Sequence, residues 1–490
     1  MTSTVESSLD RSQLFIGGKW TDPATSEVIE VVSPSTEEVV ARVPAASPAD
    51  VDRAVAAARQ AFDHGPWPRM APADRIEVMA RFSGLYAARM DEMAGLITTE
   101  IGSPISFSSL AQAPAPWMML ETFLGIAREF PWEEERAGSL GAPVIVRREP
   151  VGVVAAIPPW NVPQFTTMSK LVPALLAGCT VVVKPAPESP LDGYLMAELL
   201  AEAGVPEGVV SFVAGDRETG AHLVAHPGVD KVAFTGSTAA GRKIGAVCGE
   251  QLKRVSLELG GKSAAIVLDD ADLAGVTEGI KFIGLMNSGQ ACVAQTRILV
   301  SRRRHDEVAD ALGEMMRGLV VGDPHDPATD VGPMVARRQQ ERVEGYIDIG
   351  RQEGARMVTG GTGRPDGLDR GWFVRPTLFA GVDNGMRIAQ EEIFGPVLSL
   401  IPYDDVDDAV RIANDSDYGL AGTVWTTDAE AGLDVARRVR TGTYGVNTYT
   451  MDFAAPFGGY KASGIGREFG PEGLAQYVEY KSVYTELPAG

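Results

Sequence analysis

Residues 151–184 of the 490-residue chain read VGVVAAIPPWNVPQFTTMSKLVPALLAGCTVVVK, and this segment decides the fold class. Two short runs rich in valine, Val151–Ile157 and Thr180–Lys184, enclose a longer stretch, Thr166–Leu176, that has the length of a helix. A strand, a helix and a second strand in this order form the unit from which parallel sheets are built. The sequence therefore predicts an α/β protein with a parallel sheet covered on both faces.

The same alternation continues along the chain in two series. The first adds strands at Val209–Val213 and Lys231–Phe234, and helices at Ala49–Phe62, Ala73–Thr99, Leu191–Ala203, Gly220–His226 and Thr238–Gln251. The second, after Gly261, has strands at Ser263–Leu268, Arg297–Val300 and Pro396–Pro402, and helices at Val406–Asn414 and Asp428–Arg440. Because such sheets bind ligands at the carboxyl ends of their strands, we expect the functional residues there.

Length and charge restrict the class of protein. A chain of 490 residues is longer than one compact hydrophobic core normally supports, so two or three domains are expected. The formal charge of −21 argues against binding to nucleic acids or anionic membranes, which requires clustered Lys and Arg. The longest apolar run, Leu171–Val183, is too short for a membrane span, and three cysteines suit a reducing compartment. We expect a cytoplasmic protein.

One cysteine stands in a setting suited to catalysis. Cys179 and Cys248 lie in apolar or helical stretches typical of buried thiols, whereas Cys292 follows the small, polar run Asn287–Ala291. Glu258 and Asn161 lie upstream in motifs rich in Gly and Pro. A thiol, a carboxylate and a carboxamide together can attack a carbonyl, activate water and stabilise an oxyanion.

These residues belong to an ordered series of motifs. The series is Pro159-Trp160-Asn161-Val162-Pro163, Val183-Lys184-Pro185, Phe234-Thr235-Gly236-Ser237, Leu257-Glu258-Leu259-Gly260-Gly261-Lys262, Gly289-Gln290-Ala291-Cys292, Glu391-Glu392-Ile393-Phe394-Gly395-Pro396-Val397 and Pro456-Phe457-Gly458-Gly459-Tyr460-Lys461. It resembles the NAD(P)-dependent aldehyde dehydrogenase superfamily and covers nearly the whole chain. The resemblance implies a Rossmann-type cofactor domain, an α/β catalytic domain and a small β oligomerisation element.

The resemblance also implies residue roles. Cys292 would be the nucleophile, Glu258 the general base that activates water, and Asn161 an oxyanion donor beside the Cys292 N–H. The cofactor-binding residues would be Ile157, Trp160, Lys184, Gly236, Ser237, Glu392 and Phe394. The substrate pocket would be formed by Met118, Val162, Phe165, Ser169, Met451 and Phe457. This mostly apolar set favours medium-chain or bulky hydrophobic aldehydes, aliphatic or aromatic, although core packing would account equally well for Met118 and Met451.

One position departs from the pattern of NAD-preferring relatives. Many of them carry a Glu three residues after the Lys that matches Lys184, but Pro187 stands there and Glu188 follows it. A carboxylate at that position would repel a 2′-phosphate, so its loss leaves NADP possible beside the favoured NAD. No metal is expected, because His222 and His226 at helical spacing have no third ligand nearby in the sequence.

The resemblance divides the chain and suggests an oligomer. The cofactor domain would comprise 1–130 and 151–260, the catalytic domain 261–462, and the oligomerisation arm 131–150 and 463–490. Within this arm, Val144–Arg148 and Val478–Thr485 are β-prone and lie outside both series. They could pair with another subunit of a homodimer or homotetramer, or form a local hairpin.

Three other functions remain as alternatives. A CoA-acylating relative would need no water-activating base, and the presence of Glu258 argues against it. A binding protein that has lost its chemistry would not retain Cys292, Glu258 and Asn161 together. A Cys-dependent ester hydrolase would leave Lys184 and Glu392 unexplained. The leading hypothesis is oxidation of an aldehyde to its acid through a Cys292 thioester.

Overall fold

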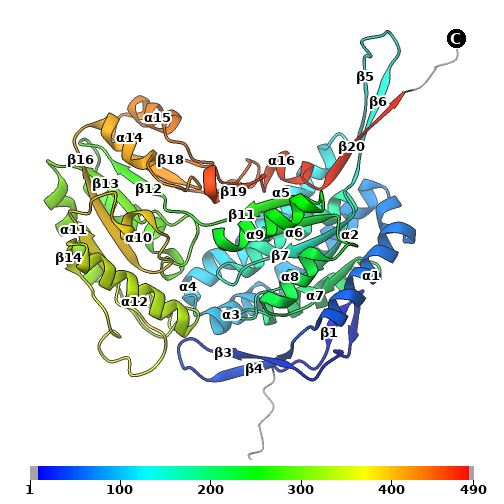
Figure 1. Ribbon diagram of the computed structural model, residues 1–490, viewed down its shortest axis with the longest axis horizontal. Helices are drawn as coiled ribbons and strands as arrows, with labels where there is room; N and C mark the ends of the chain where they lie inside the picture. Colours follow the sequence, from blue (N-terminus) through cyan, green and yellow to red (C-terminus); the bar gives the residue numbers. More distant parts are fainter. Residues whose placement is uncertain (1–8, 485–490) are drawn as a thin grey trace, which may run out of the picture.

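The computed structural model describes residues 9–484, which form two α/β units and a projecting β arm (Figure 1). The first unit is built on an eight-stranded sheet with the order β19-β11-β10-β7-β8-β9-β1-β2. Its strands are β1 (Leu14–Ile16), β2 (Lys19–Thr21), β7 (Val153–Ile157), β8 (Thr180–Val183), β9 (Val210–Phe212), β10 (Lys231–Thr235), β11 (Arg254–Glu258) and β19 (Gly464–Ile465). The α/β fold class and the four predicted strands of the first series are confirmed.

The central strands of this sheet, from β11 to β9, are parallel. The chain runs outward from β7 to β8 and β9 on one side, then returns to β10 and β11 on the other. The strand order therefore reverses between β7 and β10. In open parallel sheets the crevice at such a reversal is where ligands bind, so this topology alone indicates the position of a site.

Helices cover both faces of this sheet. They are α1 (Pro48–His64), α2 (Pro72–Ala88), α3 (Met90–Ile101), α5 (Pro114–Glu129), α6 (Pro163–Ala177), α7 (Leu191–Glu202), α8 (Arg217–Ala225) and α9 (Thr238–Glu250). Val154 and Ala156 point into the core beneath α2, α5 and α6, whereas Val153 and Ala155 point into the core beneath α1 and α8. Because alternate residues face opposite sides and both sides are covered, β7 is apolar throughout.

The single helix predicted over Ala73–Thr99 is wrong. The chain forms α2 and α3 instead, and Arg89 between them leaves the helical conformation, with φ −118° and ψ 14°. On either side of this break, α2 packs on α5, α6 and α7, whereas α3 packs on α7 and on the short segment Ser108–Gln112.

The second unit is built on a seven-stranded sheet with the order β14-β15-β16-β13-β12-β17-β18. Its strands are β12 (Ala264–Val267), β13 (Arg297–Ser301), β14 (Arg356–Thr359), β15 (Thr377–Ala380), β16 (Val397–Tyr403), β17 (Gly422–Trp425) and β18 (Gly445–Val446). Its helices include α10 (Leu273–Leu285), α11 (His305–Arg317), α12 (Arg337–Gln352), α14 (Val406–Asn414) and α15 (Ala429–Arg438). The predicted second series is thereby confirmed.

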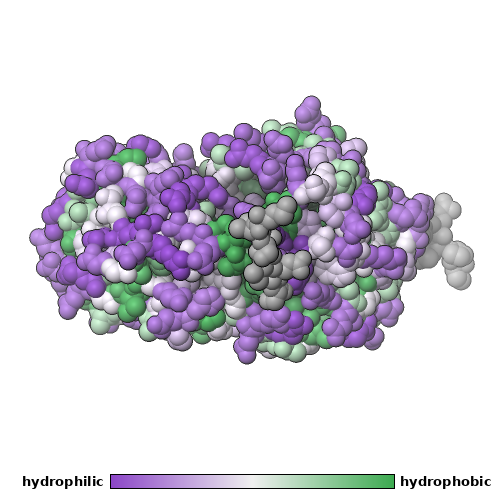
Figure 2. All heavy atoms as spheres, turned by 90° about the horizontal axis from the view of Figure 1, so that it is seen from below, coloured by the Kyte–Doolittle hydropathy of each residue, from purple (hydrophilic) through white to green (hydrophobic). Residues whose placement is uncertain are grey.

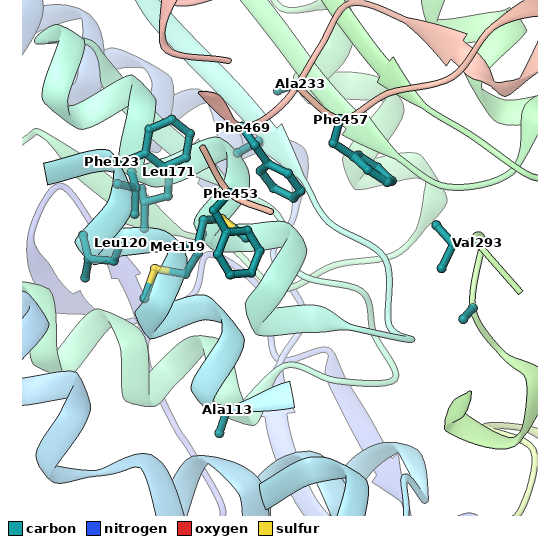
Figure 3. Packing of buried hydrophobic residues seen from close by; sticks show 14 of the residues in the cluster. Ala113, Met119, Leu120, Phe123, Leu171, Ala233, Val293, Phe453, Phe457 and Phe469 are labelled. Atoms are coloured by element: carbon teal, nitrogen blue, oxygen red, sulfur yellow. The ribbon is translucent and has the colours of Figure 1, made fainter. Parts of the chain in front are cut away.

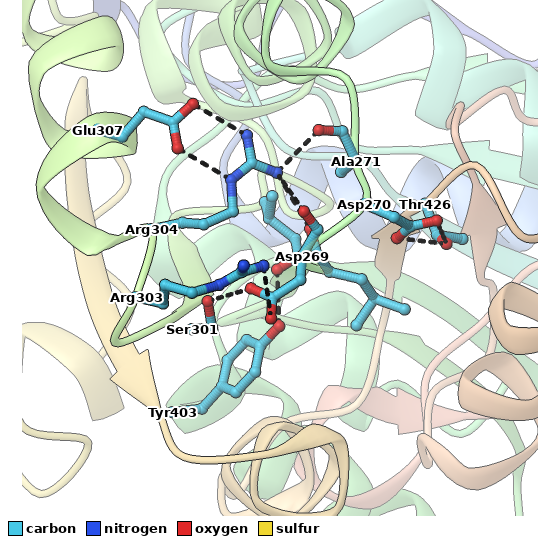
Figure 4. Close-up of polar contacts among 11 residues, drawn as sticks. Asp269, Asp270, Ala271, Ser301, Arg303, Arg304, Glu307, Tyr403 and Thr426 are labelled. Carbon is cyan, nitrogen blue, oxygen red and sulfur yellow. Dashed lines mark hydrogen bonds and ion pairs between the residues drawn. The ribbon is translucent and has the colours of Figure 1, made fainter.

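The carboxyl ends of the second sheet are closed by the chain's own polar side chains (Figure 4). Arg304 donates to the backbone oxygens of Leu268, Asp269 and Ala271, while Asp270 accepts from Thr426. These groups follow β12, β13 and β17, so this edge is occupied by a structural network. The edge formed by the carboxyl ends of the strands of the first sheet is therefore the better candidate for a ligand site.

The arm consists of β5 (Glu133–Arg136), β6 (Val144–Pro150) and β20 (Val478–Tyr484) (Figure 1). β20 and β6 pair antiparallel, from Val478 opposite Pro150 to Tyr484 opposite Val144. The two segments predicted outside the main sheets therefore pair with each other, and Thr485 lies outside the described residues. β5 and β20 remain the edge strands of this small sheet.

Two further findings concern the remaining surface. The sequence did not predict the hairpin formed by β3 (Val28–Val32) and β4 (Val39–Pro44), which runs along the lower side of the molecule in Figure 1. The short helix α16 (Gly470–Ala475) packs on α5 and α6. The face seen from below is mostly polar, with apolar residues gathered near its middle (Figure 2). None of the helices within 9–484 is long and apolar enough to cross a membrane.

Candidate active site

A cavity of about 280 Å³ opens where the strand order of the first sheet reverses. Its walls come from the carboxyl ends of β7, β10 and β11, from the turn at Cys292, from α12 and from the loop before β16. They are formed by Pro159, Trp160, Asn161, Val162, Thr235, Gly236, Ser237, Leu259, Gly260, Cys292, Gln339, Arg342, Glu392 and Phe394. The fold thus brings the predicted nucleophile, the predicted oxyanion donor and five of the predicted cofactor residues into one cavity.

Cys292 lies on a turn just after the short 3-10 segment Met286–Gly289 and is partly exposed. Burial raises the pKa of its thiol to about 12, and the negative charges of Glu392 and Glu258 raise it further. The backbone N–H groups of Cys292 and Val293 lower this pKa. The thiol is therefore neutral at pH 7 in this arrangement, and a positive charge beside it would favour the thiolate.

Asn161 follows β7 and precedes α6, and its side chain is buried at the cavity wall. Its amide nitrogen donates to the backbone oxygen of Gln290 at 2.9 Å. An amide nitrogen carries two N–H groups, so one remains beyond this bond. Asn161 and Cys292 line the same cavity, and the oxyanion role of Asn161 stays a prediction.

Glu258 is the last residue of β11 and is buried. Neither carboxylate oxygen has a hydrogen-bond partner among residues 9–484. Burial raises the pKa of Glu258 well above its usual value and Glu468 raises it further, whereas Lys170 and Arg467 lower it. A buried carboxyl without hydrogen-bond partners lowers the stability of a fold, and groups with such raised pKa values cluster at functional sites, where they suit an acid or base near neutral pH.

Glu392 is held at the cavity by the backbone of the Leu259-Gly260-Gly261 turn. Its Oε1 accepts the Gly261 N–H at 3.0 Å. A Cβ on Gly260 would lie 2.5 Å from Glu392 Oε2, and one on Gly261 would lie 2.3 Å from the Cys292 carbonyl oxygen. Position 261 therefore requires glycine, because the atom it would meet belongs to the backbone of the nucleophile, whereas a side chain at position 260 would displace the Glu392 carboxylate.

Two aromatic rings meet at right angles beside Glu392. Trp160 and Phe394 have ring centroids 5.5 Å apart at an interplanar angle of 88°. Phe394 adopts a left-handed φ of 66°, which is rare for an aromatic residue, and Gln339 and Arg342 of α12 hold the oxygens of this loop. A planar ring system would fit against these faces.

The N-terminus of α9 opens onto the same cavity. Ser237 is its N-cap and accepts the Ala240 N–H at 3.3 Å, while Gly236 joins it to β10. The first-turn N–H groups and the helix dipole suit a phosphate at this end. Structural capping and lining of the cavity thus coexist at Ser237.

Lys184 and Ile157 lie outside the cavity wall. Lys184 follows β8, and its Nζ donates to the backbone oxygens of Pro185 at 2.7 Å and Gly215 at 2.6 Å. Burial lowers the pKa of Lys184 to about 8. Ile157 is buried at the end of β7. Glu188, next to Pro187, forms an ion pair with Arg338.

The predicted substrate residues separate into three groups. Val162 lines the cavity, whereas Phe165 and Phe457 belong to an aromatic cluster with Phe453 and Phe469, at centroid distances from 5.3 to 6.0 Å. Figure 3 shows the ring of Phe469 between those of Phe453 and Phe457. Met451 packs against this core.

Met118 and Ser169 contribute nothing to the cavity wall. The Met118 residue is 52% exposed on α5, and the Ser169 hydroxyl donates to the Thr166 backbone oxygen within α6. Their substrate roles stay predictions.

Several residues of the site were missed from the sequence. Lys170 and Glu468 form a buried ion pair at 2.7 Å, and Lys170 also donates to Thr235, which lines the cavity. Gln339 and Arg342 reach the site from α12 in the second unit. A Lys on the apolar stretch Thr166–Leu176 was the one signal available, because a buried Lys needs a partner.

The described residues include no group of three or more His, Cys, Asp and Glu side chains that could hold a metal. His222 and His226 instead face Asp52, with the His222 Nε2 at 2.7 Å from its carboxylate.

Comparison with known proteins agrees with this geometry. The model of the aldehyde dehydrogenase family matches residues 20–483. The chain belongs to the aldehyde dehydrogenase family. It is 48% identical to geranial dehydrogenase from Castellaniella defragrans, over 97% of this chain and 99% of the relative.

Two solved structures of aldehyde dehydrogenases superpose closely on this family member. One is the Mycobacterium tuberculosis aldehyde dehydrogenase complexed with NAD+, with 52% identity and a TM-score of 0.96 over 99% of this chain and 100% of that one. The other is a cysteine-to-alanine variant of aldehyde dehydrogenase C from Pseudomonas syringae with NAD+ and octanal, with 41% identity and a TM-score of 0.95 over the whole of both chains. The predicted family and enzyme class, an NAD(P)-dependent aldehyde dehydrogenase, are therefore confirmed.

Proposed function

We propose that this aldehyde dehydrogenase oxidises a medium-chain or bulky hydrophobic aldehyde to its carboxylic acid through a thioester on Cys292. The observation that carries the proposal is the convergence of Cys292 and Asn161 on one cavity, with Glu258 buried and unpaired behind it. In the first step, the Cys292 thiol gives up its proton to solvent, the thiolate Sγ bonds to the aldehyde carbon, and the electron pair of the broken C=O π bond makes the carbonyl oxygen an oxyanion. The side-chain N–H of Asn161 and the backbone N–H of Cys292 would donate to that oxygen.

The cavity wall offers groups that suit the nicotinamide, its ribose and the pyrophosphate of a dinucleotide. Trp160 and Phe394 offer ring faces, Glu392 offers a carboxylate for ribose hydroxyls, and the α9 N-terminus offers N–H groups for a pyrophosphate. Bound nicotinamide supplies the hydride acceptor that converts the thiohemiacetal into a thioester. Lys184 is proposed to bind the adenosine ribose, and Ile157 to contact the cofactor.

Hydrolysis of the thioester is assigned to Glu258. Its carboxylate removes a proton from water, the resulting hydroxide bonds to the acyl carbon, and the C–S bond breaks to release the acid and restore the thiol. The raised pKa of Glu258 makes it a stronger base than an exposed Glu, provided that it is ionised.

The substrate class rests on the apolar surroundings of the nucleophile. Val162 lines the cavity with Cys292, and Phe165, Met451 and Phe457 belong to the large hydrophobic core against which Cys292 also packs. One relative is named a geranial dehydrogenase, and another was crystallised with octanal. Both aldehydes are hydrophobic, which supports the same substrate class here. NAD is the proposed cofactor, and Pro187 leaves NADP possible.

We further propose a homodimer or homotetramer in which the edge strands β5 or β20 contact another subunit. Exposed Tyr480 and Tyr484 on β20 support this. The free state of all three cysteines supports a reducing compartment such as the cytoplasm.

The test follows the absorbance of reduced nicotinamide with NAD or NADP, without CoA, across aldehydes from propanal to decanal and benzaldehyde. Reduction with the longer or aromatic aldehydes is expected. A Cys292→Ala protein that keeps full activity would overturn the mechanism, and a requirement for CoA would favour acyl transfer over hydrolysis.

A further inference from the structure

The segment before the nucleophile has an unusual backbone. Asn287, Ser288 and Gly289 have φ values of 50°, 60° and 74°, which places three consecutive residues in the left-handed region. A Cβ on Gly289 would lie 2.3 Å from the Gly395 oxygen, so only glycine fits there. Left-handed non-glycine residues are strained, and they persist at functional sites where surrounding contacts hold them.

The Asn287 side chain is one of those contacts. Its amide nitrogen donates to the Asn161 backbone oxygen at 2.8 Å and more weakly to the Gln290 backbone oxygen at 3.4 Å. Gln290 O is also the acceptor of the Asn161 side-chain amide. Asn161, Asn287 and Gln290 therefore form a closed ring of hydrogen bonds, and all three residues are buried.

This ring of hydrogen bonds restrains the direction in which the N–H groups of the Asn161 side chain point. The two N–H groups of an amide lie in one plane, so fixing one of them fixes the direction of the other. Gln290 O fixes the first N–H, and Asn287 holds the backbone from which the Asn161 side chain projects. Gln112 also reaches the Asn161 oxygen, but only at 3.4 Å, so the Asn287 bond is the shorter restraint.

We propose that Asn287 is a positioning residue for aldehyde oxidation, whose side-chain amide orients Asn161 toward the oxyanion formed at Cys292. The inference rests on the proposed role of Asn161 and adds to it a second residue that does not contact the substrate. Asn287 acts through Asn161, so its removal matters only while Asn161 is present.

The test is a double-mutant cycle on the full-length protein. Asn287→Gly keeps the left-handed backbone and removes the amide, and Asn161→Ala removes the donor itself. The readout is the rate constant for the formation of reduced nicotinamide in the first turnover, with octanal as the substrate. Each single variant is expected to lower it by about a hundredfold. The double variant is expected to be no slower than Asn161→Ala, to within about twofold.

A second readout distinguishes positioning from general damage. The rate at which iodoacetamide alkylates Cys292 depends on the thiol and its access, and it is expected to stay unchanged in Asn287→Gly. Ser288→Gly is the matched control, because it removes the Ser288 Oγ that accepts the Gly332 N–H, a hydrogen bond of the same strained segment that does not involve Asn161. It is expected to leave the first-turnover rate unchanged.

The proposal is overturned if the losses of Asn287→Gly and Asn161→Ala multiply in the double variant. It is equally overturned if alkylation falls together with turnover, or if Ser288→Gly is as slow as Asn287→Gly. Should Asn287→Gly fail to fold, Asn287→Asp has the same shape without the donor and is read in the same cycle. A wild-type protein that reduces no nicotinamide refutes the proposed function instead, which separates the two failures.

Discussion

The Nζ of Lys170 lies 2.7 Å from Oε1 of Glu468, and the two charges act with opposite signs on the pKa of Glu258. Lys170 belongs to α6 and Glu468 precedes α16, so residues 298 positions apart in the chain meet behind the site. Thr235 accepts a further hydrogen bond from Lys170 at 2.6 Å and also lines the cavity. The ion pair thus connects the basicity of Glu258 with the cavity wall.

This pair predicts opposite shifts of the pH–rate profile. Glu258 must be ionised to act as a base, so turnover rises as the pH passes through its pKa. Lys170→Met removes a charge that lowers this pKa and moves the acidic limb of kcat to higher pH. Glu468→Gln removes a charge that raises it and moves the limb to lower pH. Stopped-flow or steady-state profiles on folded variants measure both, and shifts in the same direction would contradict the assignment.

Removing the Glu258 carboxylate should separate acylation from hydrolysis. Glu258→Gln is expected to release about one reduced nicotinamide per active site in a burst, after which turnover is slower by roughly 10²–10⁴-fold. Rapid-mixing absorbance gives both phases, and mass spectrometry should detect an acyl group on Cys292. If both the burst and the steady-state turnover were lost, Glu258 would act before the thioester forms.

Position 261 of the Gly260-Gly261 turn should tolerate no side chain. Gly261→Ala would place a Cβ 2.3 Å from the Cys292 carbonyl oxygen, a backbone atom that cannot move without shifting the nucleophile. We expect a loss of stability of about 1–3 kcal/mol and a strong loss of activity. Gly249→Ala is the control, since no heavy atom lies within 4 Å of the added Cβ on α9 and alanine favours the helix. Thermal melting and kcat/KM report the two effects, and equal behaviour of the variants would refute this reading.

Cofactor choice should respond to position 187. Pro187→Glu restores a carboxylate at the place predicted to face the adenosine 2′ position, so the ratio of kcat/KM for NADP to that for NAD should fall. Glu188 already pairs with Arg338. Glu188→Gln is therefore expected to leave the ratio nearly unchanged, and a large rise in NADP use in that variant would transfer the discriminating role to Glu188.

Local sequence patterns were sufficient for most elements of the fold. The run Val151–Ile157 predicted β7, and Thr238–Gln251 predicted α9, because strand and helix periodicity depend on neighbouring residues. The break at Arg89 was missed, since it follows from where α2 and α3 pack. The hairpin β3–β4 was not predicted either, although both strands are rich in β-branched residues.

The sequence by itself determined the α/β class, the family resemblance and the identity of Cys292, Glu258 and Asn161 as candidates, because these follow from residue type, order and short spacings. The tertiary structure alone decided which charges surround Glu258, that Arg342 of the second unit reaches the cavity, and that β6 pairs with β20. Burial and the electrostatic field at a site depend on segments distant in sequence, and these meet only when the chain is folded.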